Sequence, residues 1–142
     1  MSAPSITHES RVAVLATLAS LAGASLPGSI GRGHVPDVVR LSTDGHVAFI
    51  GDAKASESAE NPATRYRLYR YFRAARRLVS RGTVVRIAIC HGESLNAAPW
   101  ERVLVGLAHD AQLAPLAPPE SREIDPETIV TSIDLAEQGG EQ

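Results

Sequence analysis

Apolar residues recur at helical spacing in three stretches of the chain, which predicts three helices. The first is capped by Thr7 and runs to about residue 22. The second starts at Pro62, directly after the capping residue Asn61, and ends near residue 80. The third covers about residues 99–112. The residues expected to face the core are Val14, Leu15, Leu18 and Leu21 in the first helix and Leu68, Phe72, Ala75 and Val79 in the second.

Shorter runs of alternating or β-branched apolar residues predict the strands. Residues 37–42 and 46–53 are expected to form a hairpin, because Asp44-Gly45 between them favours a two-residue type I′ turn. Residues 83–90 predict a strand after the second helix, and residues 128–135 predict a final strand. The order of helix, hairpin, helix, strand and helix indicates an α/β fold with a mixed central sheet flanked by helices.

The chain of 142 residues is long enough for one domain with a buried core. Residues 1–116 are expected to form this domain. Residues 114–127 are rich in proline and acids and predict a linker, so residues 117–142 are expected to be an acidic tail that can add one strand. No apolar run approaches the ~20 residues of a membrane span, and a single cysteine excludes an intrachain disulfide. A cytoplasmic location without membrane contact is the resulting expectation.

The predicted hairpin places two acids opposite each other at its open end. With the turn at Asp44-Gly45, Asp37 lies opposite Asp52. Opposed side chains have Cβ atoms about 5 Å apart, so the two carboxylates repel each other unless one is protonated or a cation lies between them. Alternation along the strand puts Lys54 on the same face. It is the only lysine in the chain, beside thirteen arginines.

Two carboxylates and a lysine on one face suit a site for a hard divalent cation. Mg²⁺ binds one or two carboxylates together with water and phosphate oxygens. A neighbouring lysine can orient an attacking water or stabilise charge on a phosphate. The alternative is a strand end at which these side chains meet only solvent, and a different loop register would separate them.

Arginines are concentrated in the second half of the predicted core. Eight of them, and no acid, lie between Arg65 and Arg86, which indicates a localised anionic partner. On a helical wheel Arg70, Arg73 and Arg77 lie opposite the apolar stripe of the second helix, and we expect them to bind nucleic acid. Two alternatives are that the acidic tail pairs with these arginines or that they form an ordinary charged surface.

The hairpin motif resembles that of a known enzyme family. "PD" at residues 36–37, followed by "DAK" at residues 52–54, a helix and a strand, is similar to the PD-(D/E)xK nuclease superfamily, which has the restriction-endonuclease-like fold. The match covers about residues 7–90. The resemblance implies that Asp37, Asp52 and the carbonyl of Ala53 hold Mg²⁺ or Mn²⁺, and that Lys54 serves the attacking water. It also leaves a homodimer open, since nucleases of this size often pair to cut two strands.

Three further positions have weaker counterparts in that family. Many members carry an acid on the first helix, and Glu9 is the only candidate here; an acid that stabilises the helix N-terminus is the alternative. RecB-like members carry a glutamine four residues before a tyrosine. This chain has Arg65 and Tyr69 at that spacing, which leaves an arginine able to contact phosphate on a flank facing the site.

These observations predict a metal-dependent nuclease that hydrolyses phosphodiester bonds in DNA. A non-catalytic nucleic-acid-binding or assembly module on a nuclease-like fold is the main alternative, and an unrelated α/β interaction domain is another. Glycine-rich phosphate loops, HExxH motifs and serine elbows do not occur in the sequence. His91, after the strand at 83–90, is interpreted as a structural or surface histidine rather than a ligand.

Overall fold

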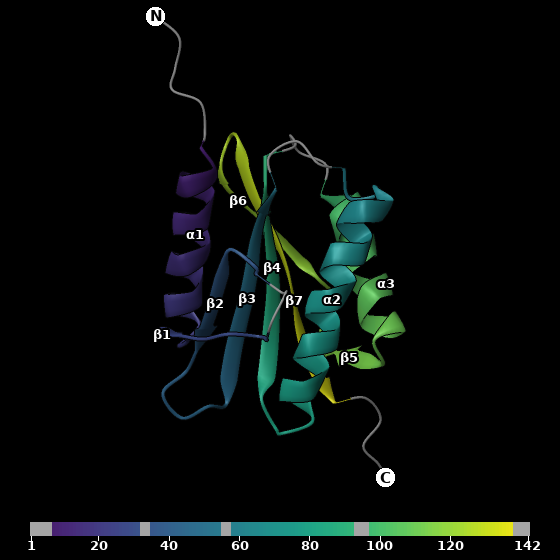
Figure 1. Ribbon diagram of the computed structural model, residues 1–142. Coiled ribbons are helices and arrows are strands. Elements are labelled where there is room, and N and C mark those ends of the chain that lie inside the picture. Colours follow the sequence, from purple (N-terminus) through teal and green to yellow (C-terminus); the bar gives the residue numbers. More distant parts are fainter. Residues whose placement is uncertain (1–6, 32–34, 55–57, 93–96, 138–142) are drawn as a thin grey trace, which may run out of the picture.

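The computed structural model describes residues 7–31, 35–54, 58–92 and 97–137. They form one mixed sheet between two helical layers, with α1 on one face and α2 and α3 on the other (Figure 1). The elements in chain order are α1 (His8–Leu21), β1 (Leu26–Pro27), β2 (Val38–Leu41), β3 (Val47–Lys54), α2 (Pro62–Val79), β4 (Val84–His91), α3 (Ala98–Asp110), β5 (Leu113–Pro115), β6 (Glu120–Asp125) and β7 (Thr128–Glu137).

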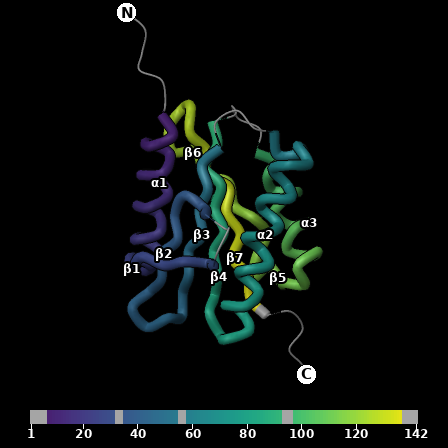
Figure 2. The backbone as a smooth tube through the Cα atoms, in the orientation of Figure 1, coloured from purple at the N-terminus to yellow at the C-terminus, as the bar shows by residue number. Residues whose placement is uncertain are grey.

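The sheet is antiparallel except at its centre. Its strands follow the order β1, β2, β3, β4, β7, and the far edge of β7 is shared by β5 and β6. The central pair of β3 and β4 is parallel, and α2 makes the crossover between them. The tube in Figure 2 shows this crossover running along the sheet from the end of β3 back to the start of β4. The expected α/β fold with a mixed sheet flanked by helices is therefore confirmed.

The hairpin of β2 and β3 has the predicted register but a different turn. Val39 pairs with Ile50 and Leu41 with Ala48, as expected. The turn is not of type I′, because Gly45 has a positive φ of 75° but Asp44 does not. A four-residue loop joins the strands instead, in which the Gly45 N–H donates to the Ser42 carbonyl. This loop has one more residue on each side than the predicted turn at Asp44-Gly45, so the same residues of β2 and β3 remain opposite each other.

The helices begin and end close to their predicted positions. The Thr7 and Asn61 side chains cap α1 and α2 as expected, and the apolar stripe of α2 is buried. The predicted core face of α1 is partly wrong. Its buried residues are Arg11, Leu15 and Ala19, whereas Val14 and Leu18 are only partly buried and Leu21 is 76 % exposed. The sheet packs against the side of α1 that carries Arg11, Leu15 and Ala19, which lie four residues apart. The apolar pattern of α1 alone does not distinguish this side from the neighbouring ones.

The predicted linker and tail are largely part of the sheet. Residues 120–125 form β6 instead of a linker, and the predicted final strand, β7, lies between β4 and the two strands β5 and β6. β6 was missed because five of its six residues are exposed, so its sequence has no apolar alternation. β6 is a strand because its backbone is hydrogen-bonded to β7, and its side-chain pattern plays no part in this. No helix of the described residues is long and apolar enough to cross a membrane.

The position of β7 can be tested by two leucine substitutions. Leu135 in β7 is fully buried, whereas Leu116, after β5, is 58 % exposed. We expect Leu135→Ala to lower the free energy of unfolding by about 2–5 kcal/mol, because it leaves a cavity in the core. Leu116→Ala should change it by about 0.5 kcal/mol or less. Urea denaturation measures both, and a small effect of Leu135→Ala would show that β7 is not part of the core.

Candidate functional site

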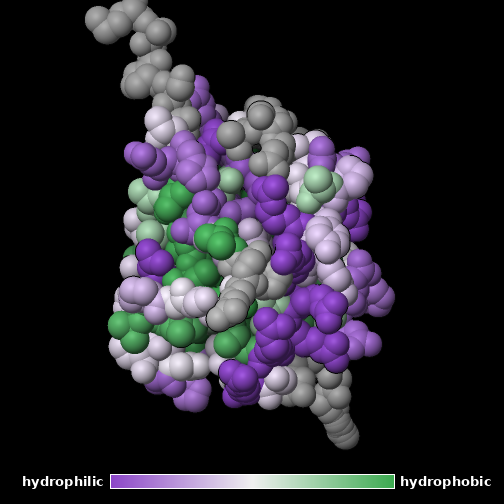
Figure 3. Space-filling model, in the orientation of Figure 1, coloured by the Kyte–Doolittle hydropathy of each residue, from purple (hydrophilic) through white to green (hydrophobic). Residues whose placement is uncertain are grey.

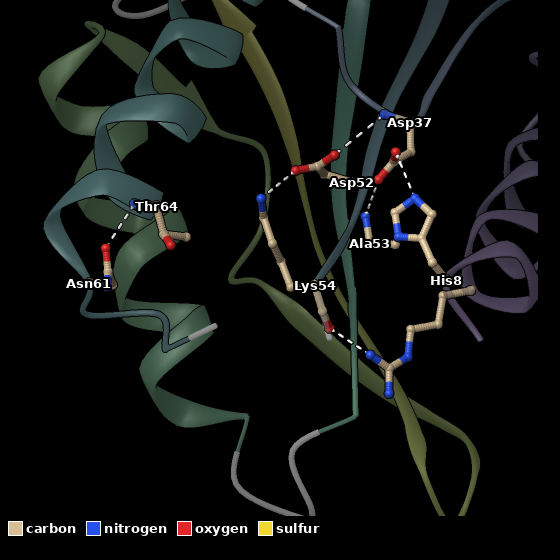
Figure 4. A network of polar contacts seen from close by, with 8 residues as sticks. His8, Asp37, Asp52, Ala53, Lys54, Asn61 and Thr64 are labelled. Carbon is tan, nitrogen blue, oxygen red and sulfur yellow. Dashed lines mark hydrogen bonds and ion pairs between the residues drawn. The ribbon is translucent and has the colours of Figure 1, made fainter. Parts of the chain in front are cut away.

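The structure brings Asp37, Asp52 and Lys54 together at the open end of the hairpin (Figure 4). The Lys54 ammonium lies 2.7 Å from one carboxylate oxygen of Asp52, and the Asp37 N–H donates to the other at 3.4 Å. Lys54 is only 2 % exposed and Asp52 only 5 %. The alternative of a strand end that simply meets solvent is therefore wrong for these two side chains.

Asp37 is held in place by two different elements. One of its carboxylate oxygens accepts the Ala53 N–H of β3 at 2.8 Å, and the other lies 3.1 Å from the His8 ring nitrogen Nε2 of α1. No sequence signal pointed to His8, because the helical pattern does not say which side of the first turn meets the hairpin. Its neighbour Glu9 is exposed in that turn, where an acid favours the helix N-terminus, and does not contact either aspartate.

The two carboxyl groups respond in opposite directions to this environment. Burial, together with a hydrogen bond with Asp37, raises the pKa of Asp52 to about 6 against the opposing effect of Lys54. Partial burial also acts to raise the pKa of Asp37, but hydrogen bonds with Asp52, Ala53 and His8 outweigh it and hold that pKa below its ordinary value. One lysine is therefore not enough to neutralise the pair, which favours a proton or a further cation between the carboxylates.

A backbone carbonyl completes the oxygen donors at this position. The register of β2 and β3, continued by two residues, places Pro36 opposite Ala53. Since the Ser42 N–H bonds to the Val47 carbonyl, Ala53 is at a position whose N–H and C=O both point toward the β2 side. Proline has no N–H, so the ladder supplies no donor to the Ala53 carbonyl. This gives the proline of the "PD" pair a physical role.

The donor set fits a hard cation such as Mg²⁺ or Mn²⁺. Two carboxylates and a carbonyl, with water and substrate oxygens for the remaining positions, are what such an ion prefers. Within the described residues no group of three or more His, Cys, Asp and Glu side chains is placed to hold a metal. A metal here would therefore depend on Asp37, Asp52 and the Ala53 carbonyl.

Arg11 crosses from α1 to the end of β3 and holds the backbone there. Its guanidinium is buried and donates to the Lys54 carbonyl at 2.8 Å. A side chain at Gly92 would collide with this guanidinium and with the Glu127 carbonyl, so glycine provides the space that Arg11 occupies. An arginine on the sheet-facing side of α1 was not predicted, because charge normally marks the outer face of a helix.

A chain of hydrogen bonds lies on the other side of Lys54. His91 is opposite Lys54 in the parallel pair of β3 and β4, stacks on Trp100 and lies 2.8 Å from the Thr131 hydroxyl. The Thr131 hydroxyl is hydrogen-bonded to the Ser121 hydroxyl, which also lies within donating distance of the Glu101 carboxylate. Burial lowers the pKa of His91 to about 4, and the Arg11 charge contributes, so the imidazole is neutral near pH 7. His91 is a buried structural residue beside the site.

The three arginines predicted to bind nucleic acid line a hollow on α2, and none of them forms an ion pair with Asp37 or Asp52. Burial raises the pKa of the Tyr71 hydroxyl, Asp52 and Asp37 raise it further, and Arg67 and Arg70 lower it. The buried Tyr71 hydroxyl is therefore within electrostatic reach of both aspartates and of Arg67 and Arg70. We call the outer side of α2 that carries Arg70, Arg73 and Arg77 the arginine face.

Two residues predicted on a flank of α2 have different surroundings. Arg65 is turned toward α3, where it lines a hollow with Pro99, Arg102 and Val103, so its predicted orientation toward the site is wrong. Tyr69 is partly buried against the core and lines the arginine face.

Comparisons of this chain with protein-family models, with curated proteins and with solved structures found no match. The interpretation of its function therefore depends on the geometry of its own residues.

The burial of His91 predicts a pH dependence of the free energy of unfolding. An unfolded histidine has a pKa near 6.5, so between about pH 6.5 and pH 4 the unfolded chain takes up a proton that the folded protein does not. The contribution of His91 to the free energy of unfolding should fall as pH drops through this window, by on the order of 3 kcal/mol in total. Asp52, whose pKa is raised to about 6, contributes in the opposite direction, so the slope of wild type has to be compared with that of a His91 variant. Urea denaturation between pH 4 and 7 measures the slope.

His91→Phe keeps a ring beside Trp100 and should remove this contribution to the slope, whatever its effect at pH 7. The matched control is His46→Gln, which changes an exposed histidine in the hairpin loop and should leave the slope in place. Equal slopes in wild type and His91→Phe would show that His91 is accessible to protons in the folded protein.

Proposed function

We propose that this protein is a Mg²⁺-dependent nuclease that hydrolyses phosphodiester bonds in DNA. The observation that carries the proposal is the convergence of Asp37, Asp52 and Lys54 at the end of the hairpin, beside a carbonyl that has no ladder donor. A solvated strand end would not bury a lysine and an aspartate at 2.7 Å.

The arrangement of elements supports a relation to the PD-(D/E)xK superfamily. That resemblance implies a helix, strands with a hairpin that carries the two motifs, a second helix and a further strand. Here α1, β1 to β3, α2 and β4 follow this order, and β4 is parallel to β3. The two motif aspartates lie at the same end of the hairpin as the resemblance requires.

Each residue has a defined task in the proposed reaction. Asp37, Asp52 and the Ala53 carbonyl would hold the ion, which supplies an activated water and neutralises charge on the phosphate. Lys54 is held by Asp52 with its ammonium group at the site, where it can orient the attacking water and stabilise negative charge at phosphorus. His8 and the Ala53 N–H fix the Asp37 carboxylate, and Arg11 fixes the backbone at Lys54.

A non-catalytic nucleic-acid-binding module is the second candidate function. It is favoured by the close pairing of Lys54 with Asp52, since a buried ion pair also serves a purely structural role. Glu9, the acid expected on the first helix, is also away from the aspartates. The two functions differ in one measurable property, the release of cleaved strands.

Cleavage assays test the hydrolytic role. We expect labelled DNA to be cut with Mg²⁺ or Mn²⁺ and to stay intact with EDTA. Asp52→Asn and Lys54→Met should each lower the rate by about 100-fold or more, because each removes a group that acts on the developing charge. The control is Asp44→Asn, which removes an exposed charge at the opposite end of the same hairpin. It keeps the Oδ1 acceptor for Ser42 and His46 and should therefore keep the register and full activity.

The assay should include duplex, single-stranded and supercoiled DNA as well as RNA. Absence of cleavage from every substrate, or equal rates in wild type and the two site variants, would overturn the nuclease proposal. Titration of metal-free protein with Mn²⁺ adds a readout without activity. Binding should be lost in Asp52→Asn and kept in Asp44→Asn.

The arginine face can be tested by the salt dependence of DNA binding. Replacing Arg70, Arg73 and Arg77 by alanine should weaken binding alike across sequences and flatten the slope of log K against log salt, by roughly 0.9 for each duplex phosphate that the variant no longer binds. A matched control replaces Arg102 and Arg122, two exposed arginines outside α2. An unchanged slope in the triple variant would place the binding surface elsewhere.

A further inference from the structure

We propose that the outer side of α2 is a binding groove for single-stranded nucleic acid, in which tyrosine rings stack on bases while arginines hold the phosphates. This inference deepens the proposed function by naming the form of its substrate, and it rests on that function only for the cleavage that follows binding. The groove is a hollow of about 340 Å³ lined by Tyr66, Tyr69, Arg70, Arg73 and Arg77.

The five lining residues form one continuous stripe along the helix. Successive residues of a helix are turned by about 100°, so positions 66, 69, 70, 73 and 77 fall on one side of α2. The two tyrosines come first, and the three arginines extend over about 10 Å toward the helix end. The stripe is long enough to contact successive nucleotides of one strand.

The charge of this stripe is uncompensated within the described residues. α2 has no acidic residue, and neither Arg70 nor Arg73 forms an ion pair with a carboxylate of the described chain. Arginines at this spacing repel each other unless an anion lies across them. Figure 3 shows the resulting hydrophilic area over α2 on the viewed face. The acids of residues 120–125 do not supply that anion, because they lie on β6 beside α1 (Figure 1).

The groove is partly preorganised. The Arg77 guanidinium donates to the Ile30 carbonyl at 3.4 Å, which restricts its position at the far end of the stripe. Tyr69 is half-buried against the core, so the rest of its side chain can face the hollow without a change of backbone. Restricting these side chains before binding lowers the entropy lost when a strand is bound.

Tyr66 distinguishes a single strand from a duplex. Its ring is 67 % exposed among arginines, where packing gives no reason for an aromatic side chain. In a duplex the base faces are stacked inside the helix and cannot meet this ring. In a single strand every base offers a face, and a basic groove with aromatic rings is the common solution for binding such strands.

The groove also lies on a path to the aspartates. In Figure 4 the Lys54 side chain points to the side of β3 on which the first turn of α2, with Asn61 and Thr64, is seen. A strand bound along α2 would therefore approach Asp37 and Asp52.

Binding is measured in EDTA, by fluorescence anisotropy, so that cleavage does not interfere. The probes are a labelled oligothymidylate of about 15 nucleotides, a strand of the same length with abasic sites throughout, and a duplex of equal length. We expect the oligothymidylate to bind more tightly than the other two. Tyr66→Leu should weaken its binding by about 5- to 150-fold, the usual effect of losing one stacked base.

Tyr66→Phe is the matched control, because it keeps the ring and removes only the hydroxyl, and it should bind as wild type does. Tyr66→Leu should leave the binding of the abasic strand unchanged, since that strand has no base to stack. The inference is overturned if the duplex binds at least as tightly as the single strand, or if Tyr66→Leu binds oligothymidylate as well as wild type.

The outcomes of this experiment and of the cleavage assay are separable. Single-strand binding that depends on Tyr66, without cleavage by any metal, would support the groove and overturn the nuclease proposal. Cleavage that requires Asp52 and Lys54, together with binding and cleavage that do not change in Tyr66→Leu, would support the nuclease proposal and overturn the groove.

Discussion

The site depends on the pairing register of β2 and β3. Side chains of a strand alternate between its two faces, so a shift by one residue would turn Asp52 and Lys54 to the α1 side and bring Ala53 to the α2 side. The loop at residues 43–46 fixes this register, with the Asp44 carboxylate accepting from Ser42 and His46. Features at one end of the hairpin therefore determine the chemistry at the other.

The same register places charged groups where the protein excludes water. Lys54 and Asp52 are buried between β3 and α2, and Arg11 is buried on the α1 side of the same strand end. Buried charges are costly unless they are paired and hydrogen-bonded. Here Lys54 is paired with a carboxylate, Arg11 with a carbonyl, and Asp37 with a backbone N–H and a histidine. These partners come from several elements, so the site can form only when the sheet and α1 are assembled.

Local sequence signals were enough to predict most of the elements and the central geometry. The capping residues Thr7 and Asn61 marked the starts of two helices. A loop with an even number of residues, centred between Asp44 and Gly45, placed Asp37 beside Asp52, although the predicted turn type was wrong. A two-residue loop and a four-residue loop with the same centre give the same pairs of opposed residues, which explains why an incorrect turn type led to a correct pairing.

The remaining features depend on tertiary contacts that a local pattern does not contain. His8 and Arg11 belong to the site only because of how α1 is rotated against the sheet. Arg65 turns toward α3, although its place in the sequence suggested the site. β6 is a polar edge strand whose hydrogen bonds with β7 define it, and its sequence, ESREID, has no apolar alternation that would predict a strand. Whether the aspartates hold an ion is a property of their charges and donors rather than of the fold.

The position of β7 inside the sheet has a consequence for synthesis of the protein on the ribosome. β4 is complete at residue 91, but its second neighbour in the sheet ends only at residue 137. At about 5–20 residues per second, the nascent chain carries an unpaired β4 edge for roughly 2 to 9 seconds. During that interval the edge, with its run of β-branched residues, can pair with another chain. Slower translation between these two strands would lengthen that exposure, so codon choice over residues 92–127 should influence the yield of folded protein.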